Sequence, residues 1–422
     1  MNFKRSLLLA ALALSLVLGL MMFRGDKTKA AVGGPICNVP TDYPTIQAAV
    51  NDPGCVTINV APGAYSENVI IPRSLTLNGA QAGVDARGRV APESVVTGAN
   101  PIGANPVISI QAANVKVDGF TLKNPITQFA AIGLAVKTAG NNAVITNNIF
   151  DGITTPDPGG NGTAQAVYLE NGPDGVSITN NEMKNIQSNR SAKGVTIGDA
   201  ASTNPSVNVL VEDNAISNVN STTRGAYGIS INNGNGTTAN AGLQVRGNAI
   251  DNLTGGGWVH AIGLEGNTPG VVVEDNDISN LTDLSPTVPA DSIAVFFENN
   301  PTFATAEVHH NNFNLTAASY GIAVHPALTT GGGSVDGECN WWNSPTGPTA
   351  ASNPGGTGTQ VSPNVDYAPW LIAPAPGGAC IGGNVPATAN QCKNGGWTTS
   401  VRADGSTFKN QGDCIQYVNT GK

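Results

Sequence analysis

The stretch VVVEDNDISNL, residues 271–281, combines the alternating apolar residues of a β-strand with an asparagine in the middle of the apolar pattern. Val271 and Val273 alternate with the outward positions Val272 and Glu274, as a strand with one buried face requires. Ile278 continues the apolar side beyond Asn276. A buried amide at Asn276 would cost about 1–3 kcal/mol if it had no hydrogen-bond partner. The fold must therefore supply partners for this side chain.

The same pattern recurs along the chain at a nearly constant interval. The aligned asparagines are Asn148, Asn181, Asn214, Asn248, Asn276 and Asn311, with spacings of 33, 33, 34, 28 and 35 residues. A second motif of the GIxL type lies between successive copies. Its copies are AIGLAV (131–136), AVYLE (166–170), GVTIG (194–198), GISIN (228–232), AIGLE (261–265), SIAVF (292–296) and GIAVH (321–325). Strand patterns repeated at this period, with no helical pattern between them, predict a stacked parallel β-solenoid.

Stacking of successive coils would supply hydrogen-bond partners for the buried asparagine side chains. If equivalent residues lie one coil apart, each amide can donate to one neighbouring copy and accept from the other. We therefore interpret the asparagines as scaffold residues, and they set the register of the remaining positions.

This repeat resembles the right-handed parallel β-helix of the pectate-lyase-like superfamily over roughly residues 40–371. The resemblance implies an all-β solenoid of about 8–10 coils. In it the GIxL segment is the first strand of each coil, the VxV segment the second and the IxNL segment the third. YPTIQAAVND (43–52) resembles an N-terminal capping helix, and CNWWNSPTGP (339–348) resembles a closing segment.

Composition divides the chain into four segments. Residues 1–31 have a basic start, an apolar stretch and a small-residue exit, which predict a signal peptide, with an uncleaved N-terminal anchor as the alternative. Residues 32–371 form the predicted solenoid. Residues 372–391, rich in Ala, Pro, Gly and Asn, are predicted to be a linker, and residues 392–422 a small disulfide-stapled module.

Six cysteines favour an oxidising compartment. Six cysteines allow fifteen pairings. Proximity in the sequence favours the pairs Cys37–Cys55, Cys339–Cys380 and Cys392–Cys414. No CxxC spacing or nearby histidine suggests a metal site among them.

Charge narrows the possible partners. Residues 32–422 contain 15 basic and 28 acidic residues, a net charge of −13. Nucleic-acid binding requires clustered basic charge, so we expect no nucleic-acid partner. We expect a monomer that is secreted or held at the cell surface, with no membrane contact apart from the signal segment. The expected partner is an extracellular or cell-wall polysaccharide.

The resemblance places polysaccharide binding on the first-strand sheet, where aligned residues form outward columns. One expected column reads Gln165, Lys193, Tyr227, His260, Asp291 and Tyr320, and a second reads Ala135, Glu170, Gly198, Asn232, Glu265, Phe296 and His325. The residues expected to take part in catalysis are His260, Asp291, Glu265 and Lys193. Substrate contacts are expected from Arg190, Arg224, Tyr227, Trp258, Phe296, Tyr320 and His325. Aromatic rings would stack on sugars, and basic groups would hold uronate carboxylates.

Several functions remain open at this stage. A hydrolase needs two carboxyl groups about 5–9.5 Å apart, whereas a lyase needs a base and a cation beside the uronate. The NTD, DD and GHG motifs of polygalacturonases and the DPH motif of alginate epimerases are absent. A non-catalytic carbohydrate-binding, adhesive or structural protein is therefore the alternative to a lyase or hydrolase. No cofactor is predicted apart from weak Ca²⁺ binding by Asp213, Glu274 and Asp275 on the second-strand face.

Overall fold

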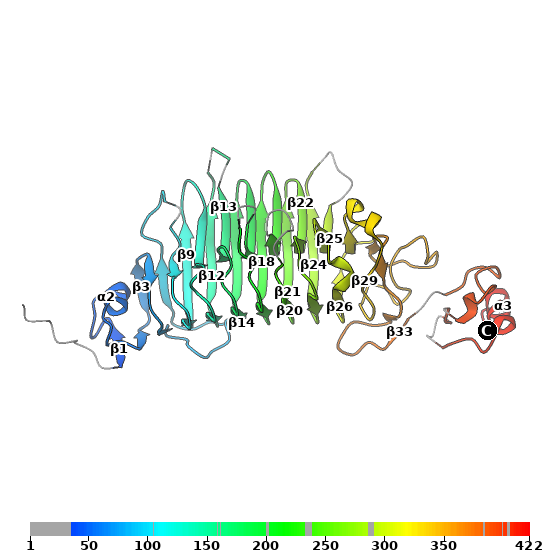
Figure 1. Ribbon diagram of the computed structural model, residues 1–422, viewed down its shortest axis with the longest axis horizontal. Coiled ribbons are helices and arrows are strands. Elements are labelled where there is room, and N and C mark those ends of the chain that lie inside the picture. The colour runs from blue at the N-terminus through cyan, green and yellow to red at the C-terminus, as the bar shows by residue number, and fades with distance from the viewer. Residues whose placement is uncertain are drawn as a thin grey trace, which may run out of the picture.

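The computed structural model describes residues 35–422 except 104, 158, 161, 200–201, 233–238, 286–290, 383–384, 399 and 403–405. The predicted signal peptide lies outside these residues. Most of the chain forms an elongated stack of β coils (Figure 1). No helix within the described part of the chain is long and apolar enough to cross a membrane.

Three parallel sheets make up the stack, and each coil contributes one strand to each sheet. Sheet A contains β1 (Ile36–Val39), β2 (Thr57–Val60), β5 (Thr76–Asn78), β8 (Lys116–Asp118), β11 (Val144–Thr146), β14 (Ser177–Thr179), β17 (Leu210–Glu212), β20 (Gln244–Arg246), β23 (Val272–Glu274), β26 (Glu307–His309), β29 (Val335–Asp336) and β31 (Val365–Asp366). Sheet B contains β3 (Gly63–Ser66), β6 (Ser94–Thr97), β9 (Phe120–Pro125), β12 (Ile149–Thr155), β15 (Glu182–Ser188), β18 (Ala215–Ser221), β21 (Ala249–Gly255), β24 (Asp277–Asp283) and β27 (Asn312–Asn314). Sheet C contains β4 (Val69–Ile71), β7 (Ile108–Ile110), β10 (Ala131–Val136), β13 (Thr163–Leu169), β16 (Ser191–Ile197), β19 (Gly225–Asn232), β22 (Trp258–Glu265), β25 (Ser292–Glu298), β28 (Tyr320–Val324) and β30 (Gln360–Val361).

The VxV segments form sheet A, the IxNL segments sheet B and the GIxL segments sheet C. The chain runs from sheet A to B to C in each turn, and the strands within the described residues form nine complete three-strand coils. The predicted parallel β-helix and its approximate number of coils are therefore confirmed.

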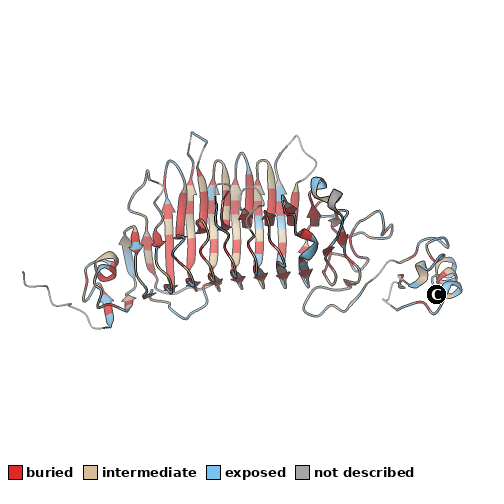
Figure 2. Cartoon of the chain, viewed as in Figure 1, coloured by how far each residue is buried: buried red, intermediate tan, exposed pale blue. Residues whose placement is uncertain are grey.

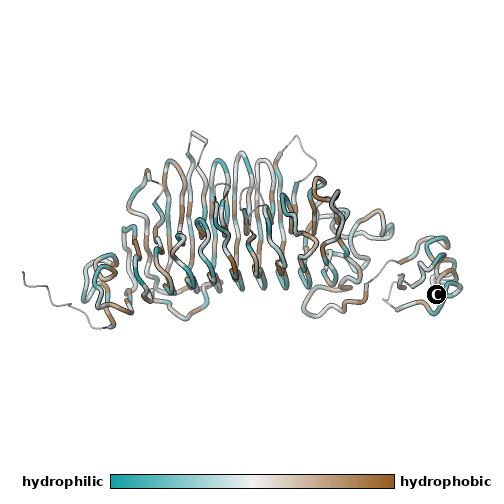
Figure 3. Tube along the Cα trace, in the orientation of Figure 1, coloured by the Kyte–Doolittle hydropathy of each residue, from teal (hydrophilic) through white to brown (hydrophobic). Residues whose placement is uncertain are grey.

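A single hydrophobic core runs through the stack, because alternate residues of all three sheets point inward. Figure 2 shows buried positions recurring along successive strands, and Figure 3 shows apolar positions recurring from coil to coil. For example, Ile178, Val211 and Val245 lie in register on three successive strands of sheet A and are fully buried. Adjacent coils thus bury one another's apolar faces, which is the source of stability in a solenoid.

The asparagines form a continuous ladder between sheets A and B. Each side-chain Nδ2 donates to the Oδ1 of the next copy, from Asn148 through Asn311 to Asn340. Asn276 is fully buried, and its Nδ2 also donates to the carbonyl oxygens of Val245 and Glu274 at 2.9 and 3.0 Å. The predicted six-member ladder is confirmed, and Asn340 extends it by one coil.

Helix α2 (Ile46–Asn51) lies at the N-terminal end of the stack (Figure 1). Its N-cap, Thr45, accepts a hydrogen bond from the backbone N–H of Ala48. Ile46 and Val50 are fully buried in the common core. The disulfide Cys37–Cys55 joins β1 to the segment that follows the helix.

The C-terminal end closes differently from the sequence-based expectation. Strand β32 (Trp370–Leu371) pairs with β33 (Cys380–Gly382), and the disulfide Cys339–Cys380 ties β33 to the last ladder turn. Ala375 exchanges two hydrogen bonds with the Asn312 side chain. Residues 372–382, which were predicted to be the first part of a linker over 372–391, therefore belong to the closing segment. The short helices η1 (Phe303–Thr305) and η2 (Pro326–Gly331) lie in connections between strands.

The C-terminal module has its own small core. Cys392, Phe408 and Cys414 are buried together, and a disulfide joins the two cysteines. Arg402 pairs with Asp413 at 2.7 Å and lies over the Phe408 ring. The module contains η3 (Gly396–Thr398) and α3 (Gln411–Thr420). All three disulfides thus have the pairing that sequence proximity favoured.

Candidate functional site

The outer face of sheet C carries most of the residues expected at the site. The observed register gives one column of Gln165, Lys193, Tyr227, His260, Ile293 and Tyr320. Ile293 takes the place expected for Asp291, and Phe296 lies opposite Gly263, not beside Glu265. Glu298 is the residue in register with Glu265, which the motif alignment did not predict, and Ala135 lies opposite Tyr168, not Glu170.

These corrections have one physical cause. The motif SIAVF (292–296) was aligned with residues 261–265, whereas residues 294–298 pair with them in the structure. A slip of two residues keeps every side chain on the same face of a strand, because the side-chain period is two. The expected residues therefore still face outward, displaced along the strand. Asp291 lies beside Trp258 instead of His260 in the register.

His260 nevertheless lies between two carboxylates. Its Nδ1 is 3.5 Å from Glu265 Oε1, and its Nε2 is 3.5 Å from Asp291 Oδ1. The residue is only 3% exposed, and both ring nitrogens are buried without a hydrogen bond of good geometry. The imidazole occupies the space between the carboxyl groups. This is where a hydrolase would need the glycosidic oxygen and a water molecule.

The electrostatics of this cluster favour a charged histidine. Burial disfavours the imidazolium, but Asp291 and Glu265 outweigh it and hold the pKa of His260 above its ordinary value. Burial likewise opposes the charge on Glu265, yet His260 and Lys193 keep the pKa of that carboxyl below its ordinary value. Burial, followed by the nearby Glu265 charge, raises the pKa of Glu298. His260 and Glu265 thus each favour the charged form of the other.

The aromatic residues pack on one another across this face. The rings of Tyr227 and His260 are 5.4 Å apart edge to face, and those of His260 and Phe296 are 4.5 Å apart. Tyr227 and Phe296 are 5% and 9% exposed, so little of either ring is available for stacking on a sugar. Trp258 Nε1 donates to the Tyr227 hydroxyl at 2.6 Å. Trp258 is partly exposed.

The C-terminal part of the face holds two further predicted residues. Tyr320 packs at the edge of a small apolar cluster that includes Ile293 and Phe296. The ring of His325 is 6.3 Å from that of Phe296, and its Nδ1 accepts a hydrogen bond from the backbone N–H of Ala327. Both side chains are partly exposed, but they line a different region from the basic residues described next.

A cleft of about 400 Å³ opens on the N-terminal side of the His260 cluster. Its lining residues are Ala130, Ile132, Thr163, Gln165, Tyr168, Arg190, Ser191, Lys193, Thr196, Asp199, Arg224 and Asn232. The structure therefore brings together Arg190, Lys193 and Arg224, as the sequence-based columns and loops suggested. Tyr168, Asp199 and Asn232 were not among the predicted contacts.

The basic groups of this cleft have no direct ion-pair partner among the described residues, although Asp199 lines the cleft and the charges of Glu265 and Asp199 act on Lys193. Within the described residues, no carboxylate lies within ion-pair distance of Arg190, Lys193 or Arg224. Lys193 Nζ donates to Ser230 Oγ at 3.1 Å and lies 4.9 Å from the centre of the Tyr227 ring. Burial lowers the pKa of the Lys193 ammonium. Three cations converge here in a chain whose net charge is −9.

The predicted alternative of Ca²⁺ binding falls on the outer face of sheet A. Glu274 and Asp213 each lie 3.8 Å from an arginine, Arg246 and Arg87 respectively. These neighbours compete with a cation for the carboxylate oxygens. Across the residues that the structure describes, no group of three histidine, cysteine, aspartate or glutamate side chains is arranged to hold a metal ion.

Comparison with known proteins yields two structural likenesses. A pectin methylesterase from Aspergillus niger is 13% identical, with a TM-score of 0.39, over 71% of this chain and 88% of that chain. The Dettilon tailspike protein is 13% identical, with a TM-score of 0.41, over 78% of this chain and 66% of the tailspike chain. No family model and no curated protein sequence matches the chain.

Proposed function

We propose that this β-helix binds an acidic polysaccharide outside the cell, with uronate carboxylates held in the cleft of sheet C. The observation that carries the proposal is the convergence of Arg190, Lys193 and Arg224 without carboxylate partners among the described residues. Guanidinium groups bind carboxylates through two parallel hydrogen bonds, which gives both affinity and orientation. The three disulfides support an extracellular location.

The remaining lining residues suit the uncharged part of a sugar. Gln165, Thr196 and Asn232 present hydroxyl and amide groups that can both donate to and accept from sugar hydroxyls. Tyr168 is held in place by its hydroxyl, which donates to Asp199 Oδ2 at 2.6 Å. This tyrosine forms one wall of the cleft beside the cations. Because its side chain is already held in place, it loses little conformational entropy when a ligand binds.

Eliminative cleavage is the second candidate function, and Lys193 favours it. A lysine whose pKa is lowered by burial can accept the proton from the carbon next to a uronate carboxylate. Arg190 or Arg224 would neutralise the carboxylate as negative charge develops on it. The electron pair then forms a carbon–carbon double bond as the glycosidic carbon–oxygen bond breaks, and the leaving oxygen takes up a proton. Hydrolysis by Glu265 and Asp291 is less well supported, because His260 fills the space between them.

Binding can be measured by calorimetry with polygalacturonate, alginate and hyaluronan, and elimination by the absorbance of unsaturated uronate. The double variant Arg190→Ala/Arg224→Ala should weaken binding by about 10-fold or more, because hydrogen bonds to charged groups contribute about 1.5–3 kcal/mol each. Affinity of the unmodified chain should fall as salt is added. Arg246→Ala on sheet A, a partly exposed arginine outside the cleft, is the matched control.

The outcomes separate the two candidates. Binding without absorbance change supports a carbohydrate-binding protein. Absorbance change that is lost in Lys193→Met, with binding retained, supports the lyase. Equal binding by the double variant and the control, or no binding to any of the three polymers, would refute the proposal.

A further inference from the structure

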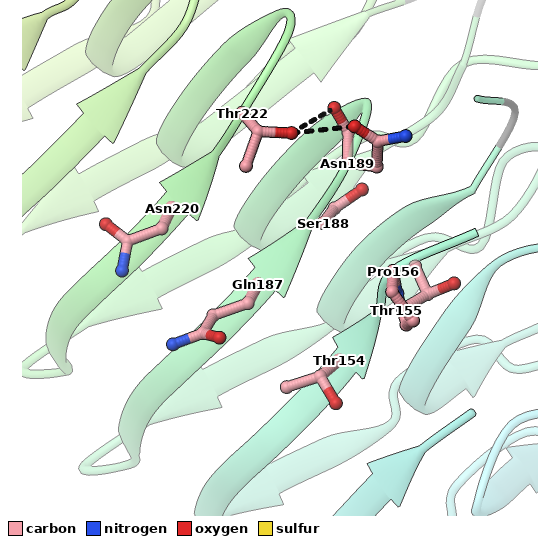
Figure 4. A pocket seen from close by; sticks show the side chains of 8 residues that line it. All are labelled: Thr154, Thr155, Pro156, Gln187, Ser188, Asn189, Asn220 and Thr222. Carbon is pink, nitrogen blue, oxygen red and sulfur yellow. Dashed lines mark hydrogen bonds between the residues drawn. The ribbon is translucent and has the colours of Figure 1, made fainter. Parts of the chain in front are cut away.

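A second cleft, of about 560 Å³, lies at the corner between sheets B and C. Its lining residues are Thr154, Thr155, Pro156, Gln187, Ser188, Asn189, Asn220 and Thr222, all of them uncharged (Figure 4). None of these residues belongs to the set predicted for the site. The cleft therefore differs in chemistry from the basic cleft on sheet C, although Asn189 of one and Arg190 of the other are consecutive.

One wall of this cleft is a ladder of free polar side chains. Thr154, Gln187 and Asn220 are paired in register on β12, β15 and β18, so they project from three successive coils on the same face. Neighbouring strands lie about 4.7–4.9 Å apart, which sets the spacing of the ladder. Thr154, Gln187 and Asn220 make no side-chain hydrogen bond to another described residue, and Gln187 is exposed. Figure 4 shows the three side chains in a row.

The other wall is fixed by internal hydrogen bonds. The Thr222 hydroxyl donates to the Asn189 side-chain oxygen at 2.7 Å and to its carbonyl oxygen at 3.0 Å. The Ser188 hydroxyl donates to the Gly162 carbonyl at 2.7 Å, and the Thr155 hydroxyl donates to the Phe129 carbonyl at 3.0 Å. This wall is therefore already ordered, which reduces the entropy lost when a ligand binds.

We propose that this cleft is a binding site for a neutral oligosaccharide. Amides and hydroxyls that are free both to donate and to accept match sugar hydroxyls, which also do both. The absence of charge from the eight lining residues leaves a carboxylated or phosphorylated ligand without a counter-charge. None of the eight described lining residues is aromatic, so hydrogen bonds and shape carry the affinity. The proposal does not depend on the function proposed for the basic cleft.

The test is calorimetric titration of the full chain with xylohexaose, cellohexaose, mannohexaose and a galactan oligosaccharide at millimolar concentration. We expect at least one of them to bind with an affinity that is insensitive to salt. Gln187→Ala and Asn220→Ala should each weaken that binding by about 2- to 10-fold, the effect of one neutral hydrogen bond. Filling the cleft with Thr154→Trp should abolish binding.

Two controls make the result specific. Gln244→Ala removes another exposed glutamine, on sheet A, and should leave binding unchanged. Arg190→Ala/Arg224→Ala should also leave neutral-sugar binding unchanged, while it weakens acidic-polymer binding. No binding by any of the four sugars, or binding that Gln187→Ala, Asn220→Ala and Thr154→Trp do not alter, would overturn the proposal. Neither result would bear on the basic cleft.

Discussion

Replacing Asn276 with leucine tests whether the asparagine ladder holds the coils together. Leucine has the same branching and number of side-chain heavy atoms as asparagine, so the change removes hydrogen bonds and leaves the shape almost intact. The Asn276 side chain takes part in five hydrogen bonds: two that it accepts from Asn248, and three that it donates to Val245, Glu274 and Asn311. The residue is fully buried, so water cannot replace the missing partners.

The main cost comes from the groups left behind. The backbone N–H of Asn248 loses the acceptor that lies 3.0 Å away, and an unsatisfied buried donor costs about 1–3 kcal/mol. Losing the donated hydrogen bonds adds to this, and the greater burial of apolar surface by leucine offsets part of it. We expect Asn276→Leu to lower the free energy of unfolding by about 2–5 kcal/mol.

Two measurements check this expectation. Denaturant unfolding should show a lower midpoint, and amide hydrogen exchange should increase first in the coils that contain Asn248 and Asn276, because each coil contacts only its neighbours. Gln244→Leu is the matched control, since Gln244 is exposed on the adjacent strand β20. If Asn276→Leu and Gln244→Leu have the same midpoint and the same exchange pattern as the unmodified chain, the ladder does not stabilise the solenoid.

Three further predictions follow from the geometry. Because the pKa of His260 is raised in the folded chain, its charge stabilises the fold below pH about 6.5. This contribution is lost as pH rises through the folded pKa, so the unfolding midpoint of His260→Gln should fall less between pH 6 and 9 than that of the unmodified chain. Replacing Cys339 and Cys380 with serine opens a loop of 41 residues and should cost about 4 kcal/mol by denaturant unfolding; unchanged stability would contradict this. Gly228→Ala would place a Cβ 2.6 Å from the Ala261 carbonyl oxygen, so it should lower the melting temperature through a cost of about 1–3 kcal/mol, whereas an unchanged melting temperature would show that the backbone adjusts.

The sequence predicted the fold well because the repeat encodes it redundantly. Every copy contains the same inward apolar positions and the same asparagine, so an error in one copy does not alter the interpretation. Asn340 was missed because its segment, CNWWN, lacks the apolar pattern of the other copies. The linker boundary was misplaced because residues 372–382 have the composition of a linker, although pairing and a disulfide fix them to the stack.

The site was less predictable because it depends on local register. Two-residue slips occur in two coils, although the face itself was correct. One placed Asp291 where Ile293 lies and hid Glu298, and the other placed Ala135 beside Glu170 although Ala135 pairs with Tyr168. The uncharged cleft at the corner between sheets B and C was not predicted, for another reason. Threonine, asparagine and glutamine occur throughout the turns of this chain, so composition gives no signal that Gln187 and Asn220 line a cavity.

The uncharged cleft lies at the corner between sheets B and C, and the basic cleft on the face of sheet C reaches this corner at Arg190 and Arg224. The length of this corner varies from coil to coil. Seven residues connect β12 to β13 and eight connect β24 to β25, whereas two or three make this connection in the three coils between them. From β11 to β27 the turn between sheets A and B has two residues in every coil, because the asparagine ladder requires one amide at a fixed position. Before the ladder begins, 15 residues make this turn between β5 and β6. Variation in length is therefore confined to corners without the ladder. Arg190, Asn189 and Arg224 lie in these short connections, so changes there can alter ligand recognition while the ladder and core keep the coils in register.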